Sequence, residues 1–423
     1  MRIPNLASAV KPADPRDVRR HNLSLVLREV AERGPRSRAT IALETGLNKT
    51  TVSSLVAELI EIGLLRESGR ERPGAVGRPA QNVEVDTAGP FVLGLEVNVD
   101  YLAADATDLA GGAHHSAFVR NDNRGEPSEV LAGLMDLAER ALGERFAAGR
   151  RPAATTVAVP GLVDGEGRLV VAPNLHWADV AVADLMSPAL GPVTVENEAN
   201  LGAVAELVEG AGLGLRDFVY ISGEIGIGAG IVIGGELFRG ARGFGGEIGH
   251  LTIDPYGPPC GCGSRGCLER LAGQDALLRL AGWDPRMRGP GPRREWPGAM
   301  LAEAARQGNA KTLEALSQVG HTLGIAIASV VNMLNPEAVL LGGYFAPLVD
   351  WLQEPIEREL HSRLLAGDGS GCRVLAARLG GEAAVRGASA LSRREALSDP
   401  AALAGLTASV IDPPQVPEVA RRS

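Results

Sequence analysis

The sequence predicts an α/β protein in which a small, mostly helical unit precedes a larger body. Residues 18–62 show helical periodicity interrupted by glycine, whereas short strands alternate with helices beyond Asp86. The length of 423 residues also exceeds the usual range of a single domain. We therefore expect one domain at 1–86, a second at 87–392, and a partly disordered tail at 393–423.

The composition is that of an ordinary globular protein, with 45% hydrophobic and 22% charged residues. No window approaches the twenty apolar residues of a membrane helix, and the N-terminus lacks the apolar core of a signal peptide. We therefore expect a cytoplasmic protein with no membrane contact. The net charge is −9, yet residues 1–86 carry 14 basic against 11 acidic side chains, which is compatible with a small nucleic-acid-binding unit.

The first unit shows the pattern of three short helices. The first helix ends at Gly34, and the second, in "SRATIALETGL", is followed by a turn at Gly46. Asn48 is suited to cap the third helix, whose apolar stripe is Val52, Leu55, Leu59 and Ile62. A helix, a glycine-containing turn and a further helix together form the helix-turn-helix plan.

The third predicted helix carries short polar side chains near its N-terminal end. They are Lys49, Thr50, Thr51, Ser53 and Ser54. Such groups suit contact with phosphates and base edges in the major groove of double-stranded DNA. A capping cluster on a solvated face would use the same residue types.

The segment after this helix favours DNA binding over the capping interpretation. "LLRESGRERPGAVGRPAQNVEV" passes from a strand through a basic Gly/Pro loop into an alternating strand, as in a β-hairpin wing. The wing carries Arg70, Arg72 and Arg78, and Arg78 suits a narrow minor groove. Helix-turn-helix, wing and charge together predict a winged helix-turn-helix domain that binds double-stranded DNA.

In the body, "FVLGLEVNVDYLAADATDLAGG" predicts two strands joined by a tight turn at residues 98–101, and a helix is expected at about 129–148. The segments beginning near Thr155 and Val193 repeat the order of strand, turn and helix. "DFVYISGEIGIGAGIVIGGEL" adds a Gly-rich hairpin, and residues 309–334 predict a long, mostly buried helix.

Three of the four cysteines lie within "CGCGSRGCLE". Cys260, Cys262 and Cys267 have C-x-C-x4-C spacing, and His250 lies ten residues upstream in "EIGH". A Cys3His set is the soft tetrahedral ligand set that suits structural Zn²⁺. A disulfide is disfavoured because cytosolic thiols stay reduced and three is an odd number. Cys372 is expected to be an ordinary free thiol.

Several motifs in order make the body resemble the ROK family of repressors, open reading frames and sugar kinases. They are "PGLVD" at 160–164, "APNLHW" at 172–177, "ENEANLGAVAE" at 196–206, "GFGGEIGH" at 243–250 and the cysteine cluster. The resemblance implies an actin-like ATPase fold with two ribonuclease-H-like lobes. Together with the N-terminal domain, it points to the transcriptional-regulator branch of the family.

The resemblance also implies a sugar site beside a zinc loop at about 247–269. The implied sugar-binding residues are Asn197, Glu198, Glu247, His250 and Glu269. His250 can serve both sites, with one ring nitrogen on zinc and the other toward a sugar hydroxyl. Asn174 is a softer candidate for the same cleft, since an Asn before an apolar residue is more often a turn former.

The chain departs from the family's kinases at the positions that hold ATP. Glu96, Asn98 and Val99 stand in "LEVNVDY", where the kinases have an Asp-x-Gly-Gly-Thr turn, and Glu224 stands in the second phosphate loop. A carboxylate facing a triphosphate repels it, and without glycine the backbone is closed to phosphate. The kinases' catalytic Asp is also replaced, by Glu198. We therefore expect no catalytic residues and no kinase activity.

The resulting prediction is a sugar-responsive transcriptional repressor of carbohydrate-utilisation genes, acting as a homodimer or homotetramer. Two alternatives remain open: a sugar kinase that retains a DNA-binding domain, and a constitutive DNA-binding protein with a vestigial cleft. The identity of the sugar, the operator and the sign of the response stay open as well.

Overall fold

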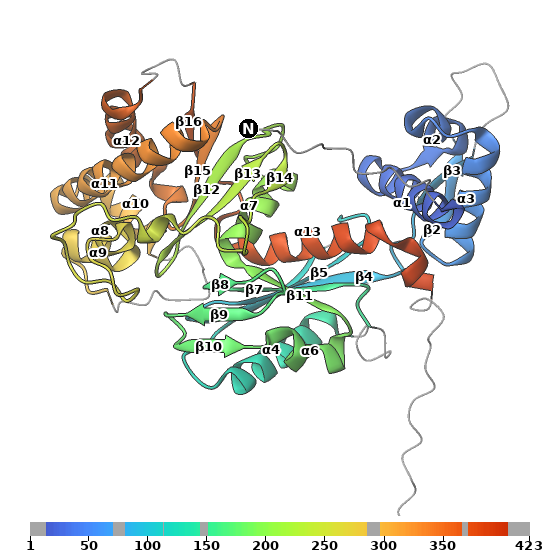
Figure 1. Ribbon diagram of the computed structural model, residues 1–423, viewed down its shortest axis with the longest axis horizontal. Helices are drawn as coiled ribbons and strands as arrows, with labels where there is room; N and C mark the ends of the chain where they lie inside the picture. The colour runs from blue at the N-terminus through green and yellow to red at the C-terminus, as the bar shows by residue number, and fades with distance from the viewer. Residues whose placement is uncertain are drawn as a thin grey trace, which may run out of the picture.

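The computed structural model describes residues 14–70, 81–112, 114–143, 151–285, 297–365 and 371–404. It contains an N-terminal unit and a body of two lobes, each built on a five-stranded sheet (Figure 1). No helix among the described residues is both long enough and apolar enough to span a membrane.

The N-terminal unit has the predicted winged helix-turn-helix architecture. Its elements are α1 (Pro15–Arg33), β1 (Arg36–Ser37), α2 (Arg38–Thr45), α3 (Lys49–Glu61), β2 (Leu65–Arg70) and β3 (Gln81–Val85). Ser37 and Asn48 cap α2 and α3 through their side chains, and Gly46 ends α2 in the left-handed conformation. Strands β2 and β3 pair antiparallel and, with β1, form a sheet of order β1-β3-β2. The predicted hairpin is therefore present, while its tip at 71–80 lies outside the described residues.

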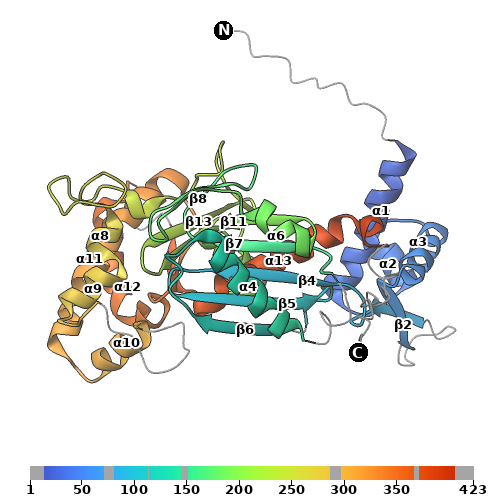
Figure 2. The same ribbon diagram turned by 90° about the horizontal axis from the view of Figure 1, so that it is seen from below.

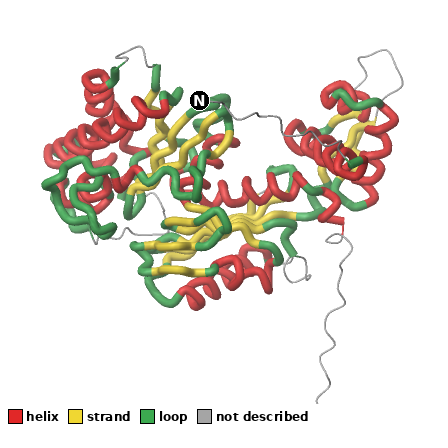
Figure 3. Tube along the Cα trace, viewed as in Figure 1, coloured by secondary structure: helices red, strands yellow, loops and turns green. Residues whose placement is uncertain are grey.

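The first lobe is a sheet of order β11-β7-β4-β5-β6. Its strands are β4 (Phe91–Val97), β5 (Tyr101–Asp108), β6 (His114–Arg120), β7 (Thr155–Val159) and β11 (Val193–Asn197). Helices α4 (Pro127–Leu142) and α6 (Val182–Leu190) cover one face, as Figure 3 shows. A small sheet of β8 (Leu162–Val163), β9 (Leu169–Ala172) and β10 (Trp177–Val180) lies at its edge. Strand β6 is not among the strands predicted from the sequence.

The second lobe repeats this topology in the order β14-β13-β12-β15-β16. Its strands are β12 (Phe218–Gly223), β13 (Ile227–Ile233), β14 (Glu236–Leu237), β15 (Ala338–Gly343) and β16 (Arg373–Ala376). In both sheets three successive strands pair antiparallel; a fourth strand then adds in parallel to the first strand, and a fifth adds in parallel to the fourth. This internal repeat is the pair of ribonuclease-H-like lobes that the family resemblance implies.

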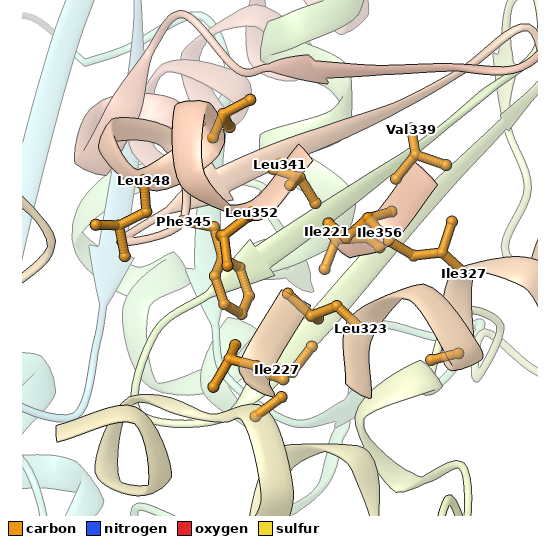
Figure 4. Packing of buried hydrophobic residues seen from close by; sticks show 14 of the residues in the cluster. Ile221, Ile227, Leu323, Ile327, Val339, Leu341, Phe345, Leu348, Leu352 and Ile356 are labelled. Carbon is orange, nitrogen blue, oxygen red and sulfur yellow. The ribbon is translucent and has the colours of Figure 1, made fainter. Parts of the chain in front are cut away.

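Helices of the second lobe cover its sheet and enclose its core. They are α7 (Glu198–Glu209), α8 (Leu268–Ala272), α9 (Gln274–Leu280), α10 (Gly298–Arg306), α11 (Ala310–Leu334) and α12 (Val349–Arg363). Figure 4 shows the apolar contacts between this sheet and α11 and α12: Ile221 and Val339 from the strands meet Leu323, Ile327 and Ile356. All of these side chains are buried, so this core holds the second lobe together.

The last described helix, α13 (Ala383–Ser398), connects the body with the N-terminal unit (Figures 1 and 2). It packs on β4, β7 and α7, and Ser392 Oγ donates to the Leu93 carbonyl over 3.1 Å. Gly387 is required here, because a Cβ on it would lie 1.8 Å from the Leu201 carbonyl oxygen of α7. At its other end, Ser24 Oγ of α1 donates to the Leu397 carbonyl over 2.8 Å.

The expected start of the tail at residue 393 falls inside α13, which is followed by a 3-10 turn at Pro400–Leu403. Arg393 donates to the carbonyls of Ala31 and Leu109 at 3.0 and 2.8 Å, so it joins the helix to both neighbouring units. The remainder of the expected tail, beyond residue 404, lies outside the described residues.

Candidate functional site

The predicted metal ligands come together in one cluster. The ligand atoms of His250, Cys260, Cys262 and Cys267 all lie within 4.8 Å of one another. Cys260 Sγ is 3.8 Å from His250 Nδ1, and Cys262 Sγ is 3.7 Å from Cys267 Sγ. Tetrahedral zinc with ordinary Zn–S and Zn–N bonds would place such pairs about 3.6 and 3.8 Å apart. The donor set and its spacing therefore fit Zn²⁺.

The cluster joins two segments that are separate in the sequence, a 3-10 turn and the start of α8. His250 ends a 3-10 turn at Ile248–His250, and Cys267 is the N-cap of α8. Between them, the Ile253 amide donates to the Gly266 carbonyl over 2.8 Å. Gly266 has φ +58°, and a Cβ there would lie 1.6 Å from the Asp254 carbonyl oxygen. Only glycine allows the chain to fold back so tightly that the cysteines converge.

A cleft of about 230 Å³ lies beside the cluster. It is smaller than the roughly 300–1,000 Å³ typical of drug-sized ligands, so it suits a smaller molecule. Every predicted sugar-binding residue lines this one cleft: Asn174, Asn197, Glu198, Glu247, His250 and Glu269. They come from the β9–β10 turn, the β11–α7 junction, the 3-10 turn and α8. The cleft is therefore formed by both lobes.

Asn197 has most of its hydrogen-bonding capacity occupied within the protein. Its Oδ1 accepts from the amides of Ala199 and Asn200 at 2.9 and 3.1 Å, which caps α7. Its Nδ2 donates to the Gly161 carbonyl over 2.9 Å. One N–H of the amide remains for a ligand, so Asn197 chiefly fixes the start of α7 and hence the position of Glu198.

Glu198 lines the cleft and lies in a strongly acidic environment. Burial, together with the carboxylates of Glu96, Asp100 and Glu247, raises its pKa to about 8. Its Oε2 accepts a hydrogen bond from Asn98 Nδ2 at 3.2 Å. Glu198 therefore carries a proton at neutral pH in the free protein and can either donate to or accept from a hydroxyl.

Two further carboxyl groups line the opposite wall. Desolvation raises the pKa of Glu247; His250 opposes this shift and Glu269 adds to it. Glu269 Oε1 accepts from the Cys260 thiol at 2.9 Å and lies 3.7 Å from His250 Nδ1. The metal cluster and the cleft therefore share a wall.

A second, very small cavity lies on the other side of Glu198. Its volume is about 10 Å³, roughly the space of one water molecule. Glu96, Glu224 and Glu198 line it, together with Tyr101 and Tyr220. Tyr101 Oη donates to Glu96 Oε1 over 2.5 Å. Glu96 and Glu224, the two acidic residues expected to oppose ATP binding, thus line a narrow, acidic space.

The predicted DNA-contacting residues of α3 lie at its N-terminal end. Lys49, Thr50, Ser53 and Ser54 are exposed, whereas Thr51 is half-buried. The Thr51 amide donates to Asn48 Oδ1 at 2.8 Å, and Ser53 Oγ donates to the Lys49 carbonyl at 2.8 Å. The opposite stripe of Val52, Leu55 and Leu59 is buried in the unit's core. Arg70 ends β2, and Arg72 and Arg78 lie outside the described residues.

Two residues with polar side chains, one in the cleft and one beside Glu198, were not predicted as members of the site. Arg270 lines the cleft from α8, and Asn98 contacts Glu198 from the β4–β5 turn. The sequence marks Asn98 as unusual, because it stands in the turn where the family's kinases have glycine. No sequence feature marks Arg270, because the direction of its side chain depends on how the metal cluster orients α8.

The chain is similar to known regulators and to sugar kinases. The ROK family pattern matches residues 92–395. The xylose repressor of Bacillus spizizenii is 33% identical over 384 residues, covering 90% of this chain and 96% of the repressor. The glucokinase of Halalkalibacterium halodurans is 32% identical over 251 residues, covering 56% of this chain and 74% of the kinase.

Among solved structures, a ROK family transcriptional regulator homologous to the Escherichia coli MLC protein matches with a TM-score of 0.75 and 26% identity. The match covers 93% of this chain and 100% of that one, so it includes the N-terminal unit as well as both lobes. Pattern, sequence and structure agree, and the chain belongs to the ROK family.

Proposed function

We propose that this protein is a transcriptional repressor that binds double-stranded DNA through its N-terminal unit and responds to a sugar bound in the cleft. One observation carries the proposal: a single chain joins an exposed polar end of α3 to a cleft rich in carboxyl and amide groups. The xylose repressor, which this chain matches along 96% of the repressor's length, supports this combination. A repressor of this kind acts in the cytoplasm.

The chemistry of the cleft suits a monosaccharide. Carboxyl and amide groups bind vicinal hydroxyls with paired hydrogen bonds, and such a site rejects analogues that lack a hydroxyl. Glu198, Glu247 and Glu269 supply carboxyl groups from different sides of the cleft, and Asn174 adds an amide. No metal is needed as a ligand for the sugar.

Zinc, when bound by His250, Cys260, Cys262 and Cys267, would supply structural cross-linking and no open coordination position. The four residues hold the 3-10 turn that carries Glu247 against the helix that carries Glu269. They therefore position two of the proposed sugar ligands relative to each other.

On the DNA side, we propose that Lys49, Thr50, Thr51, Ser53 and Ser54 of α3 contact the major groove, with Arg70, Arg72 and Arg78 on the wing. The exposed start of α3 supports this, because amide and ammonium groups there attract phosphate. Operators with two half-sites would require a homodimer or homotetramer.

Sugar kinase activity is the second candidate, favoured by the likeness to a glucokinase. The 10 Å³ cavity beyond Glu198 argues against it, because it has room for about one water molecule and not for a triphosphate. Its lining by Glu96, Glu198 and Glu224 would also repel phosphate. We therefore propose that the protein binds sugar without phosphorylating it.

A paired assay separates the two candidates. Thermal shift with a panel of pentoses and hexoses, including D-xylose and D-glucose, should reveal at least one stabilising sugar. The same sugar with Mg-ATP should release no ADP above the protein-free rate. Sugar-dependent ADP release would establish the kinase, whereas the absence of stabilisation by any sugar would favour constitutive DNA binding.

A further inference from the structure

Asn98 begins the turn between β4 and β5 and is 2% exposed. Its side-chain oxygen accepts a hydrogen bond from the Val99 amide at 2.7 Å, and its Nδ2 donates to Glu198 Oε2 at 3.2 Å. Flipping the amide group would lose the first of these bonds and place an oxygen against Glu198. The orientation of the Asn98 donor is therefore determined by its own backbone.

The turn that carries Asn98 is itself held by buried hydrogen bonds. Asn123 is fully buried and donates from Nδ2 to the carbonyls of Asn98 and Tyr101 at 2.7 and 2.8 Å. Asn121 Nδ2 in turn donates to Asn123 Oδ1 at 2.6 Å. A donor held by such a network keeps its place when the cleft fills or empties.

Glu198 lies between two cavities and contributes to the walls of both. Carboxylates face it from every side: Glu96 from β4, Asp100 from the β4–β5 turn, Glu247 from the 3-10 turn, and Glu224 across the small cavity. Like charges repel the carboxyl group without giving it a direction. The neutral amide of Asn98, by contrast, donates a directional hydrogen bond to one of its oxygens.

We propose that Asn98 is a positioning residue of the sugar site, which engages one oxygen of Glu198 and so presents the rest of that carboxyl group to the cleft. The proposal rests on the proposed function. It adds to the sugar site a residue from the β4–β5 turn of the first lobe. The raised pKa of Glu198 supports it, because a protonated carboxyl group accepts from Asn98 with one oxygen and offers its hydroxyl to a ligand.

The experiment measures the affinity of D-xylose and D-glucose by calorimetry for the parent protein, Asn98→Ala and Asn98→Asp at pH 5.5 and 8.0. Losing one hydrogen bond to a carboxyl group should weaken sugar binding about tenfold in Asn98→Ala at both pH values. Asn332→Ala is the matched control: Asn332 also donates to a neighbour, at the far end of α11, and its substitution should leave the affinity unchanged.

Asn98→Asp provides the test that a purely structural role would fail. At pH 8.0 it places a further carboxylate against Glu198 and should weaken binding more than Asn98→Ala does. At pH 5.5 the new acid takes up a proton and can donate again, so binding should recover relative to Asn98→Ala. Parent-like affinity in Asn98→Ala, or an equal loss at both pH values in Asn98→Asp, would overturn the proposal.

A second measurement separates this proposal from the proposed function. The Glu198 carboxyl is titrated without sugar by ¹³C NMR, assigned by its absence in Glu198→Gln. Asn98→Ala should raise the pKa of Glu198 further, because the charged form loses a donor. An unchanged pKa would overturn the positioning role even if sugars bind. A parent protein that binds no sugar would instead overturn the proposed function.

Discussion

Glu198 is the residue on which the chemistry of the cleft depends most, through its carboxyl group. In the family's kinases, as the sequence resemblance implies, an acid at this place removes a proton from the sugar. Here burial and three neighbouring acids keep Glu198 protonated at neutral pH, with a pKa of about 8. A protonated carboxyl is a poor base and a good hydrogen-bond partner, which suits binding more than catalysis.

The raised pKa of Glu198 predicts a specific pH dependence of stability. Below about pH 4.5 the group is protonated in both the folded and the unfolded protein, and above about pH 8 it is ionised in both. Between these values the folded state binds the extra proton, so stability falls as pH rises. The pKa shift corresponds to about 1.4 kcal/mol per unit, so Glu198→Gln should gain on the order of 5 kcal/mol over the parent at pH 8.5 and little at pH 4.5.

Urea unfolding of both proteins at several pH values checks this expectation. Glu354→Gln is the control, because Glu354 is an exposed residue of α12 paired with Arg358. Its free energy of unfolding should follow the parent's at each pH. A constant difference between Glu198→Gln and the parent across this range would show that Glu198 titrates normally.

The Cys3His cluster predicts about one tightly held zinc ion per chain. Cys262→Ser should lose the metal and lower the melting temperature, because the free energy of metal binding contributes to folding. Cys372→Ser is the matched control, since Cys372 lies outside the cluster. Elemental analysis of the three proteins, purified without added metal, measures the zinc content per chain. Zinc-free parent protein, or full zinc retention in Cys262→Ser, would contradict the assignment.

At the residue level, site residues that lie close together in the sequence could be predicted, whereas contacts between distant positions could not. The metal cluster was predictable because three of its ligands lie within eight residues and the fourth is ten residues upstream. The contact between Asn98 and Glu198 joins positions one hundred residues apart, and nothing in either local pattern indicates the other. Such pairs become visible only in the folded sheet, where the parallel strands β4 and β11, separated by β7, end at the same edge.

At the level of elements, the helix-turn-helix unit could be predicted and α13 could not. Helices α2 and α3 have caps, a glycine turn and an apolar stripe, which all lie within their own sequence. Helix α13 instead buries small residues such as Gly387, Ala388 and Ser389, because it packs closely on β4 and α7. Close packing removes the large apolar stripe by which an amphipathic helix is identified.

Helix α13 gives the N-terminal unit a fixed contact with the body. Leu397 is buried in the same core as Leu23 and Val26 of α1, while Gly387 of the same helix touches α7 behind the cleft. We expect a change at the start of α7 to reach the DNA-binding unit along this helix. The coupling requires α13 to move as a rigid element between two packed states.

Substitution of Leu397 tests this route. Leu397→Ala should lower the free energy of unfolding by about 2–5 kcal/mol and reduce the effect of sugar on DNA affinity. Leu360→Ala opens a comparable cavity in the second lobe's core, far from α1, and should cost similar stability while keeping the sugar effect. Fluorescence anisotropy with labelled DNA, with and without sugar, measures both. Equal sugar effects in the two variants would rule out transmission through α13.

At the scale of the whole molecule, the cleft is lined by residues of both lobes. The N-terminal unit lies at the far end of α13 (Figure 2). A sugar that binds one arrangement of the lobes better than another shifts the population toward it. In a homo-oligomer such a shift changes the spacing of two DNA-binding units. Sugar and DNA affinities must then be linked, and linkage is reciprocal.

The linkage between sugar and DNA is tested by a reciprocal titration with DNA that the protein selects from a random library and the sugar that stabilises it most. Sugar should change the DNA dissociation constant by some factor, and DNA should change the sugar dissociation constant by the same factor. Glu247→Ala should abolish the sugar effect while binding DNA like the parent. Sugar binding in the cleft with an unchanged DNA dissociation constant would contradict this linkage.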